Sequence, residues 1–389
     1  MVISNESRLN WLNLVGFGKR GKLPAYLECQ STQYVFLARN AIYHGLKILG
    51  IRAGQKILVP AYHCSAIVDP IQAFGAKVVF YRIAPDCSPD LEDVKSKLDN
   101  QTKAILAVHY FGFPAPVEQL KAFCATHKLF LIEDCAHVFK DSSNLNTLGS
   151  HGHISFFSFK KFLPVYDGGC LMINMNLPFE RLQLQKEGAA LSLKVAKNLL
   201  ERVMADSSDP TARSLGNLLI KVYRGMRVFF PRKLENSKVL GLSVTAPRFD
   251  SSFADLPMTR LSQRVLRSAD FGSIVERRRA NYNYLVRATV GLRGFVPLHP
   301  QLPEVICPWV FPAFSTQVKN LHKQLREHGV AAFAWDGVIH PTLPLEEFPE
   351  VVDLYNNLIC LPIHQDLKRQ DLDFMVEILK GLILGTDSK

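Results

Sequence analysis

Apolar runs of strand length alternate with segments of helical length along the first half of the chain. Runs that are apolar on both faces indicate buried strands, and their alternation with helices is typical of right-handed β-α-β units in a parallel sheet. Residues 37–49 carry apolar side chains at helical spacing, and Gly50 then provides a stop signal. The chain therefore predicts an α/β fold with strands at residues 56–60, 78–81, 104–108 and 129–132.

The second half of the chain follows a different pattern. Apolar residues between positions 258 and 286 keep helical spacing and predict one long helix. Residues 292–384 mix both periods and predict a smaller α+β lobe, with strands at 305–311 and 330–334 and helices at 318–328 and 371–384. These patterns predict three parts: an irregular N-terminal arm (1–36), a large domain (37–256), and a linking helix with a small C-terminal domain (257–389).

The large domain contains a basic helical insertion at about residues 175–256. A helix predicted at 215–230 sets apolar residues against Lys221, Arg224 and Arg227. Such a helix can lie on an anionic membrane surface. It can equally pack on the core of its own protein with a solvated cationic face, and the pattern leaves both interpretations open.

Composition changes this picture little. Apolar residues make up 48% of the 389, as in an ordinary soluble globular protein. There is no run of eighteen apolar residues and no charged-then-apolar leader, so we expect a cytoplasmic protein. The eight cysteines show no C-x-x-C spacing, which predicts reduced thiols instead of disulfides or a zinc site. His151 and His153 have no neighbouring Cys or carboxylate cluster, so we expect no metal.

The net charge of the chain is +11, with an isoelectric point near 9.2. Such a balance favours polyanionic partners, which include nucleic acid, anionic membranes and phosphorylated molecules. We expect phosphorylated small molecules, with possible peripheral contact to an anionic membrane and no nucleic acid.

The best candidate for a reactive group is Lys161, in the run F-S-F-K-K-F-L-P-V-Y-D-G-G at residues 157–169. A lysine amine becomes a nucleophile toward carbonyls when apolar or cationic neighbours lower its pKa. Phe159 and Phe162 supply the apolar surroundings, and Lys160 supplies the charge. On this run alone, an ordinary Lys-Lys turn between two strands is the more frequent explanation, because surface lysines vastly outnumber catalytic ones.

A carboxylate upstream makes the chemistry more specific. Asp134 follows the strand predicted at 129–132, and ligands of open α/β sheets bind at the carboxyl ends of strands. A lysine that forms a Schiff base with an aldehyde, and an aspartate that keeps a pyridine nitrogen protonated, are the pair that pyridoxal phosphate requires. Lys161 and Asp134 therefore predict a pyridoxal phosphate site.

At these residues the sequence resembles the DegT-type family of fold-type I aminotransferases, and especially a compact variant with the pattern S-L-R-K-W-L-P-V-P-D-G-G. The family lysine precedes a glycine pair that begins seven positions later, which selects Lys161 over Lys160. The resemblance covers residues 37–174 well, thins over 258–382 and does not cover the middle. It implies a fold-type I α/β fold with a cofactor-binding large domain, a homodimer, glutamate as amino donor and a keto group on a nucleotide-linked sugar as acceptor, in polysaccharide or glycoconjugate biosynthesis.

The resemblance also implies roles for further residues. His137 stands where the family has a Gln or His that touches the 3-hydroxyl of the cofactor. Ser158 and the pair Arg39-Asn40 stand where the family binds the cofactor phosphate, the latter at a helix N-terminus that favours anions. The usual family residues at that helix are small and hydroxylic, so Arg39-Asn40 departs from the pattern.

Two more departures concern the ring and the partner subunit. The family places an aromatic ring over the pyridine at the position of Cys64, so either this thiol packs on the ring or Tyr62 or His63 replaces it. A family segment that contributes an Asn from the partner subunit has its nearest match at 256–259, which lacks that Asn. In the small domain, the side chains expected to line a substrate pocket are Trp335, Asp336, His340 and His364.

Two other functions come from different classes. A related branch dehydrates a sugar carbon with the same cofactor, but there a His replaces the lysine, and Lys161 argues against it. Alternatively, the chain keeps the fold and acts as a pyridoxal phosphate-binding regulator or a membrane-associated assembly protein. This alternative function is compatible with the altered phosphate loop, the missing partner Asn and the basic insertion. Fold alone does not fix function.

Overall fold

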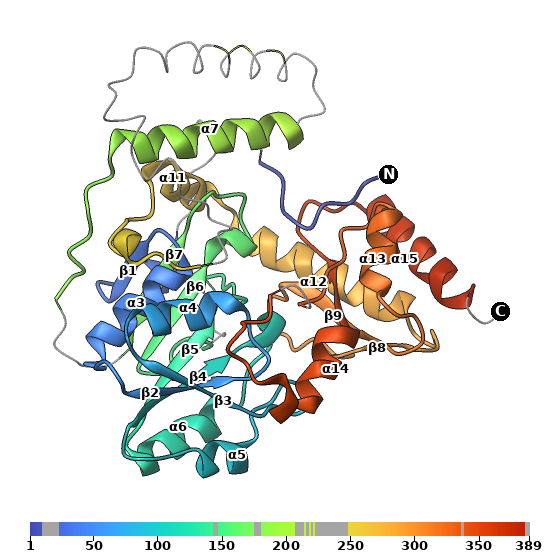
Figure 1. Cartoon of the computed structure of the whole chain (residues 1–389). Helices are drawn as coiled ribbons and strands as arrows, with labels where there is room; N and C mark the ends of the chain where they lie inside the picture. The colour runs from blue at the N-terminus through green and yellow to red at the C-terminus, as the bar shows by residue number, and fades with distance from the viewer. Residues whose placement is uncertain are drawn as a thin grey trace.

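A computed structural model describes residues 1–9, 23–142, 147–174, 180–206, 214, 218, 221, 248–335 and 338–385. The chain forms a large lobe around a seven-stranded sheet and a smaller lobe around a three-stranded antiparallel sheet (Figure 1). The long helix α12 (Phe271–Ala288) runs from the large lobe into the smaller one, and the N-terminus lies beside the smaller lobe (Figure 1). The fold class predicted from the sequence is confirmed.

The large sheet has the strand order β1-β7-β6-β5-β4-β2-β3. Strands β3, β2, β4, β5 and β6 are parallel to their neighbours, whereas β7 is antiparallel to both β6 and β1. The central strands are buried on both faces, as their apolar runs predict. The strand bounds are β1 (Thr32–Val35), β2 (Lys56–Pro60), β3 (Lys77–Tyr81), β4 (Thr102–Val108), β5 (Phe130–Cys135), β6 (Ile154–Ser158), β7 (Gly169–Ile173), β8 (Phe295–Pro297), β9 (Val310–Ser315) and β10 (Leu358–Pro362).

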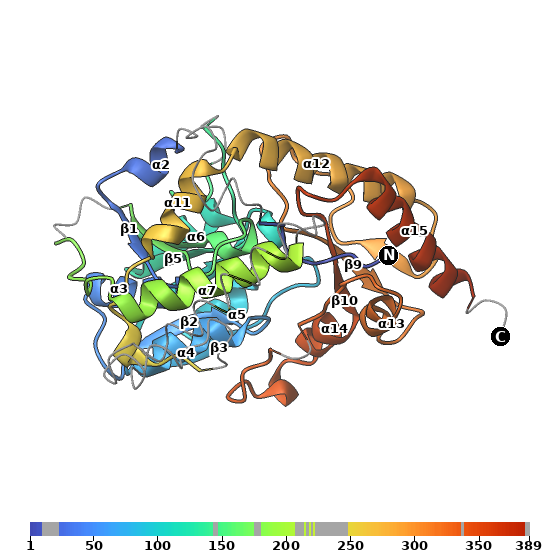
Figure 2. The same ribbon diagram turned by 90° about the horizontal axis from the view of Figure 1, so that it is seen from above.

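Helices cover the sheet and build the second lobe. Helix α3 packs on β6 and β7, α6 packs on β4 and β5, and α7 lies beside α11 (Figure 2). In the smaller lobe, α13 and α15 pack together, and α15 also contacts α12. The other helix bounds are α2 (Ala25–Glu28), α3 (Ala38–Ile48), α4 (Ser65–Ala73), α5 (Leu91–Ser96), α6 (Val117–His127), α7 (Ala189–Asp206), α11 (Arg260–Ser268), α13 (Leu321–Glu327), α14 (Pro349–Asn357) and α15 (Arg369–Leu384).

The structure differs from the sequence-based prediction at four places. The strand predicted at 305–311 is displaced, because residues 305–309 form a loop and β9 begins only at Val310. Residues 1–36 are not wholly irregular, because α2 and β1 lie within them and β1 forms an edge of the main sheet. The helix predicted over 258–286 is two helices, since Ala269 leaves the helical conformation and the side chain of Asp270 caps α12 by accepting from Ser273 N. The strand predicted at 330–334 makes only isolated bridges.

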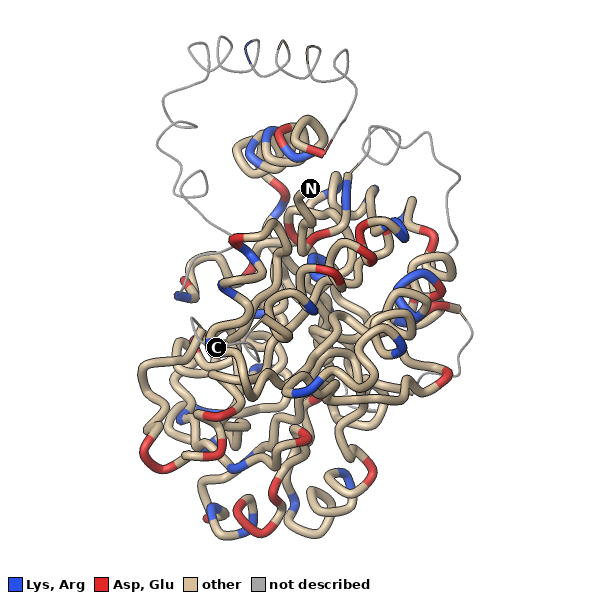
Figure 3. Tube along the Cα trace, turned by 90° about the vertical axis from the view of Figure 1, so that its right-hand side faces the viewer, with Lys and Arg blue, Asp and Glu red and all other residues tan. Residues whose placement is uncertain are grey.

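The basic insertion cannot be judged in the same way. The helix predicted at 215–230 lies almost entirely outside the described residues, so its two interpretations stay open. Acidic and basic residues are interspersed along the described chain (Figure 3). Among the described residues, no helix is long and apolar enough to cross a membrane.

One edge of the large sheet positions the chemistry. Strands β2 and β4 are neighbours, but the chain continues from β2 to one side and from β4 to the other, which makes their carboxyl ends a topological switch point. The residues that follow β2, β4, β5 and β6 therefore meet at this edge, together with the start of α3.

Candidate active site

A cavity of about 350 Å³ lies at this edge, in the size range of small-molecule sites. Its wall combines the strand ends of the large lobe with α3, α4, aromatic residues of the smaller lobe and the N-terminal segment. The sequence-predicted residues that line it are Arg39, Cys64, Asp134, His137, Ser158 and Lys161.

Lys161 ends the short helix η2 (Phe159–Lys161), which follows β6 directly. Its Nζ atom lies 4.5 Å from the centre of the Trp309 ring. Desolvation lowers the pKa of this amine, while the charge of Asp134 works in the opposite direction. A lysine in this environment is neutral more often than a surface lysine, as nucleophilic chemistry requires.

Asp134 lies near the end of β5 and is 5% exposed. Its Oδ1 atom accepts a hydrogen bond from Ala136 N at 2.8 Å. Burial raises the pKa of this carboxyl group, and the nearby positive charge of Lys161 lowers it. Because each group influences the ionisation of the other, the carboxylate and the amine face a common space.

His137 is buried against aromatic rings. Its imidazole stacks on Trp309 with ring centres 4.2 Å apart and planes inclined by 16°. Phe111 N donates to His137 Nδ1 at 3.2 Å, from which we assign the imidazole proton to Nε2. Burial holds the pKa of His137 well below its ordinary value, and the charge of Lys161 adds to this shift. His137 is therefore a neutral side chain with one N–H to donate.

Of the three residues expected to bind the cofactor phosphate, two line the cavity and one does not. Ser158 and Arg39 line the cavity, with Arg39 in the first turn of α3. Asn40 does not line it: its side-chain amide donates to the carbonyl oxygens of Phe253 and Ala254 at 2.7 and 3.0 Å. In the structure, Asn40 thus ties α3 to a loop of its own chain.

The three residues considered for packing on the cofactor ring do not all line the cavity. Cys64 lines the cavity at the start of α4, and His63 beside it does so too. Tyr62 is absent from the cavity wall, because it is fully buried against Trp335 with ring centres 4.7 Å apart. The imidazole of His63 stacks on Phe80 at 4.9 Å. Of the three, Cys64 and His63 are placed to reach a ligand.

Several cavity residues carry no clear signal in the sequence. Trp335 lines the wall as expected, whereas His340 pairs with Asp69 and His364 contacts the Ser4 carbonyl away from it. Asp336 lies outside the described residues. The rarity of tryptophan could have drawn attention to Trp309, since the chain has three. Lys160 was considered only as a charged neighbour of Lys161, and other polar or aromatic lining residues that sequence reasoning missed include Asn5, Glu6, Tyr110 and Phe333.

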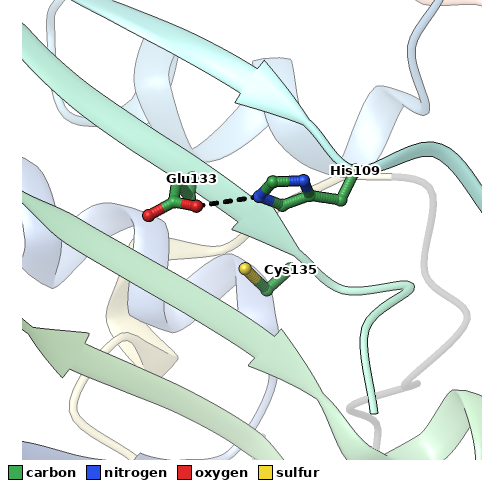
Figure 4. A group of neighbouring side chains, drawn as sticks. All are labelled: His109, Glu133 and Cys135. Atoms are coloured by element: carbon green, nitrogen blue, oxygen red, sulfur yellow. Dashed lines mark hydrogen bonds and ion pairs between the residues drawn. The ribbon is translucent and has the colours of Figure 1, made fainter. Parts of the chain in front are cut away.

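One cluster beside the cavity has metal-ligand chemistry but serves the fold. His109, Glu133 and Cys135 lie together on adjacent strand ends (Figure 4). His109 Nε2 donates to Glu133 at 2.9 Å, and His109 Nδ1 accepts from Ala115 N. The Glu133 oxygens also accept from the backbone N–H groups of residues 149, 151 and 152. These bonds occupy the imidazole and carboxylate atoms that a metal would need.

The set of side chains suits pyridoxal phosphate. A partly desolvated amine can bond to its aldehyde, a buried carboxylate can hold its ring nitrogen, and a neutral imidazole N–H can face its hydroxyl. Ser158, Arg39 and the N-terminus of α3 offer donors to a phosphate. Residues that the sequence separates widely therefore form one compatible site.

Solved structures share this architecture over the whole chain. The aminotransferase TlmJ from Streptoalloteichus hindustanus superposes with a TM-score of 0.69 at 17% identity, covering 100% of both chains. Spr1654 of Streptococcus pneumoniae in its PLP form gives 0.69 at 16% identity, covering 99% of this chain and 100% of the other. The chain thus has the aminotransferase fold. Residues 22–194 match the DegT/DnrJ/EryC1/StrS aminotransferase family, which confirms the family resemblance over that part.

Curated relatives match over part of their length. GDP-perosamine synthase of Vibrio cholerae is 34% identical over 167 residues, which is 42% of this chain and 46% of that protein. A UDP-N-acetyl-3-dehydro-alpha-D-glucosamine 3-aminotransferase of Acidithiobacillus ferrooxidans is 29% identical over 145 residues, 36% and 39% of the two chains. A pleiotropic regulatory protein of Geobacillus stearothermophilus is 32% identical over 139 residues, 35% and 37%. The chain spans less than half the length of these relatives.

Proposed function

We propose that the chain is a pyridoxal phosphate-dependent aminotransferase that moves an amino group from an amino acid to a keto-sugar. The observation that carries this proposal is that Lys161, in the turn after β6, and Asp134, at the end of β5, line one cavity. The fold and the family match support it.

Lys161 is the residue that moves the proton. When bound, pyridoxal phosphate supplies a ring that accepts the electron pair left behind as a proton leaves the substrate carbon. The neutral Nζ of Lys161 takes that proton as general base and returns it as general acid. Desolvation favours the neutral amine, which can accept the proton. The nearby Asp134 carboxylate favours the protonated amine, which can return it.

The neighbouring residues hold and orient the ring. Asp134, fixed by Ala136 N, would accept a hydrogen bond from the protonated ring nitrogen and so favour its charged form. His137, held by Phe111 N and stacked on Trp309, would donate a hydrogen bond from its Nε2–H group to the 3-hydroxyl. The aromatic wall excludes water from this end of the cavity, which strengthens each polar interaction inside it.

The names of the relatives support a nucleotide-linked substrate. Two of them name GDP- or UDP-linked sugars, and the family resemblance implies glutamate as donor. Arg39 and Lys160 on the cavity wall suit the phosphates of such a substrate or of the cofactor. We further propose a homodimer and a role in polysaccharide or glycoconjugate biosynthesis. The large-domain and small-domain boundaries at 37–256 and 257–389 and a cytoplasmic location stay predictions.

A second candidate is a pyridoxal phosphate-binding regulator of the same fold. Its support is the similarity to the pleiotropic regulatory protein and the replacement of the usual stacking aromatic by Cys64. A regulator would bind the cofactor without converting a keto-sugar.

Single-turnover assays separate the two functions. The protein is loaded with pyridoxal phosphate, treated with glutamate, and assayed for 2-oxoglutarate; the aminated form is then mixed with keto-sugar nucleotides. We expect 2-oxoglutarate, an aminated sugar, and neither product with Lys161→Ala. Cofactor binding without either product would favour the regulator.

A further inference from the structure

Lys160 is a second lysine on the wall of the active-site cavity. It lies between Phe159 and Lys161 in η2, so that one turn of helix presents both amines to the same space. Its ammonium makes no hydrogen bond and no ion pair with the described residues. The side chain is half-buried, and desolvation lowers its pKa, while the carboxylate of Glu6 raises it.

The surroundings of Lys160 are mainly positive. Arg39 lines the same cavity from α3, and Arg202 approaches from α7; both add to the lowering of the Lys160 pKa. The carboxylate that acts on Lys160 is Glu6, in the N-terminal segment, which lines the same cavity. Glu6 is already engaged, because its carboxylate pairs with Arg202 at 2.8 Å.

Arg202 also fixes the backbone of this segment. Its Nη2 atom donates to the Ser7 carbonyl at 2.6 Å, and the Ser7 hydroxyl donates to the Phe162 carbonyl at 3.2 Å, one residue after Lys161. The segment is therefore held in place beside η2. Glu6 is kept near Lys160 without being free to neutralise it.

Arg202 pairs with both Glu6 and Asp206, so neither carboxylate is free to neutralise Lys160, and the charges that act on Lys160 remain mainly positive. A half-buried ammonium without a partner is costly, and an anionic ligand that binds it removes that cost. A lysine ammonium suits phosphate, since it acts as a compact point charge toward phosphate oxygens.

We propose that Lys160 binds a phosphate group of a ligand in the active-site cavity, and that Glu6 opposes this binding. The proposal deepens the proposed function and rests on it. The phosphate has two candidate sources: the cofactor, or the diphosphate of a nucleotide-linked substrate.

The two sources of the phosphate are distinguished by comparing the dissociation constants of three probes for wild type and Lys160→Met. The probes are pyridoxal phosphate, pyridoxal, and inorganic pyrophosphate added to the cofactor-loaded protein. If Lys160 holds the cofactor phosphate, the dissociation constant for pyridoxal phosphate rises at least about tenfold and that for pyridoxal does not. If it holds the substrate phosphate, the constant for pyrophosphate rises by that factor instead. Lys47→Met removes the same charge from an exposed position in α3 and leaves all three constants within about twofold.

Glu6→Gln provides the opposite test. It removes the opposing charge and releases Arg202, so the phosphate probe that weakens in Lys160→Met is expected to bind more tightly. The proposal fails if all three constants for Lys160→Met stay within twofold of wild type, if pyridoxal weakens as much as pyridoxal phosphate, or if Lys47→Met has the same effect. Failure of the proposed function is distinct, because wild type itself would then form no visible band with pyridoxal phosphate, or would form the band but yield neither 2-oxoglutarate nor an aminated sugar in the single-turnover assay.

Discussion

Two consecutive lysines face different electrostatic surroundings in this cavity. Lys161 lies over the Trp309 ring and shares its space with Asp134, whereas Lys160 shares its space with Glu6 and Arg39. The first environment suits a nucleophile and a proton carrier; the second suits an anion. Under the proposed function, these adjacent lysines have different roles, one in proton transfer and one in binding a phosphate.

Asp167 provides a test of electrostatics at the residue scale. This carboxyl group is fully buried and accepts from Thr259 N, Thr259 Oγ1 and Ser262 Oγ at 2.6, 2.8 and 2.5 Å. Burial outweighs these bonds and raises its pKa from 3.8 to about 6. Between these values the unfolded chain releases a proton that the folded chain keeps. The raised pKa of Asp167 therefore adds to the free energy of unfolding below about pH 4, and this contribution is lost as pH rises to about 6.

Comparison with Asp167→Asn isolates that contribution. We expect the free energy of unfolding of wild type, relative to Asp167→Asn, to fall by about 3 kcal/mol between about pH 4 and 6. Denaturant titrations across this range measure it. A difference between the two proteins that stays constant with pH would contradict the raised pKa.

At the scale of elements, the strands that the sequence predicts in the large sheet are continuous apolar runs. Strands β2, β4 and β5 are apolar runs because both faces are covered. Strand β1, with sequence TQYV, lacks such a run, and its place is set by pairing with β7, which lies far along the chain. Likewise, Lys161 and Asp134 were predictable from local patterns, whereas the engagement of Asn40 with Phe253 depends on a distant loop.

Glu133 fixes the turn between β5 and β6, and its substitution tests that role. In Glu133→Gln, an amide NH₂ replaces one oxygen and meets backbone N–H groups that it cannot bond. We expect a loss of about 3 kcal/mol in the free energy of unfolding, measured by denaturant titration. Glu118→Gln is the control: Glu118 pairs with His151 of the same turn but is exposed, and its loss is expected to cost less than about 1 kcal/mol. Equal losses for both variants would refute this role.

Gly169 sets the approach of α3 to the sheet. A Cβ atom at this position would overlap the main-chain carbon and oxygen of Leu37, directly before the helix. We expect Gly169→Ala to lower the free energy of unfolding by about 2 kcal/mol or more and to weaken pyridoxal phosphate binding, because the start of α3 must shift. At Gly188 no atom lies within 4 Å of such a Cβ, so Gly188→Ala is expected to change stability by less than about 1 kcal/mol.

At the scale of the whole molecule, the site exists only because the smaller lobe folds against the sheet edge. Trp309, Phe333 and Trp335 come from that lobe and complete the cavity wall. Trp335 was expected there, but the part of Trp309 and Phe333 could not be predicted from the sequence, since no local period reports how two lobes meet. The short helix η1 (Tyr110–Gly112), which follows β4, helps to join them: Trp309 N donates to the Phe111 carbonyl at 2.8 Å.

Arg278 holds the two lobes together from within α12. Its buried guanidinium donates to the Trp309 carbonyl at 2.8 Å and to Gln365 Oε1 at 2.9 Å, and it lies over the Phe162 ring. We expect Arg278→Met to lower the free energy of unfolding by about 3 kcal/mol and to weaken pyridoxal phosphate binding. Arg287→Met, at an exposed site of the same helix, is expected to change neither by more than about 0.5 kcal/mol. A comparable effect of both variants would rule out this role.

The most direct measurement is to identify the lysine that bonds to the cofactor. The protein is incubated with pyridoxal phosphate, reduced with borohydride, digested and mapped by mass spectrometry. We predict one pyridoxyl-modified residue, Lys161, with the visible absorbance band lost in Lys161→Ala and retained in Lys160→Met. Modification of Lys160 in preference to Lys161, or a protein that forms no band, would contradict the account.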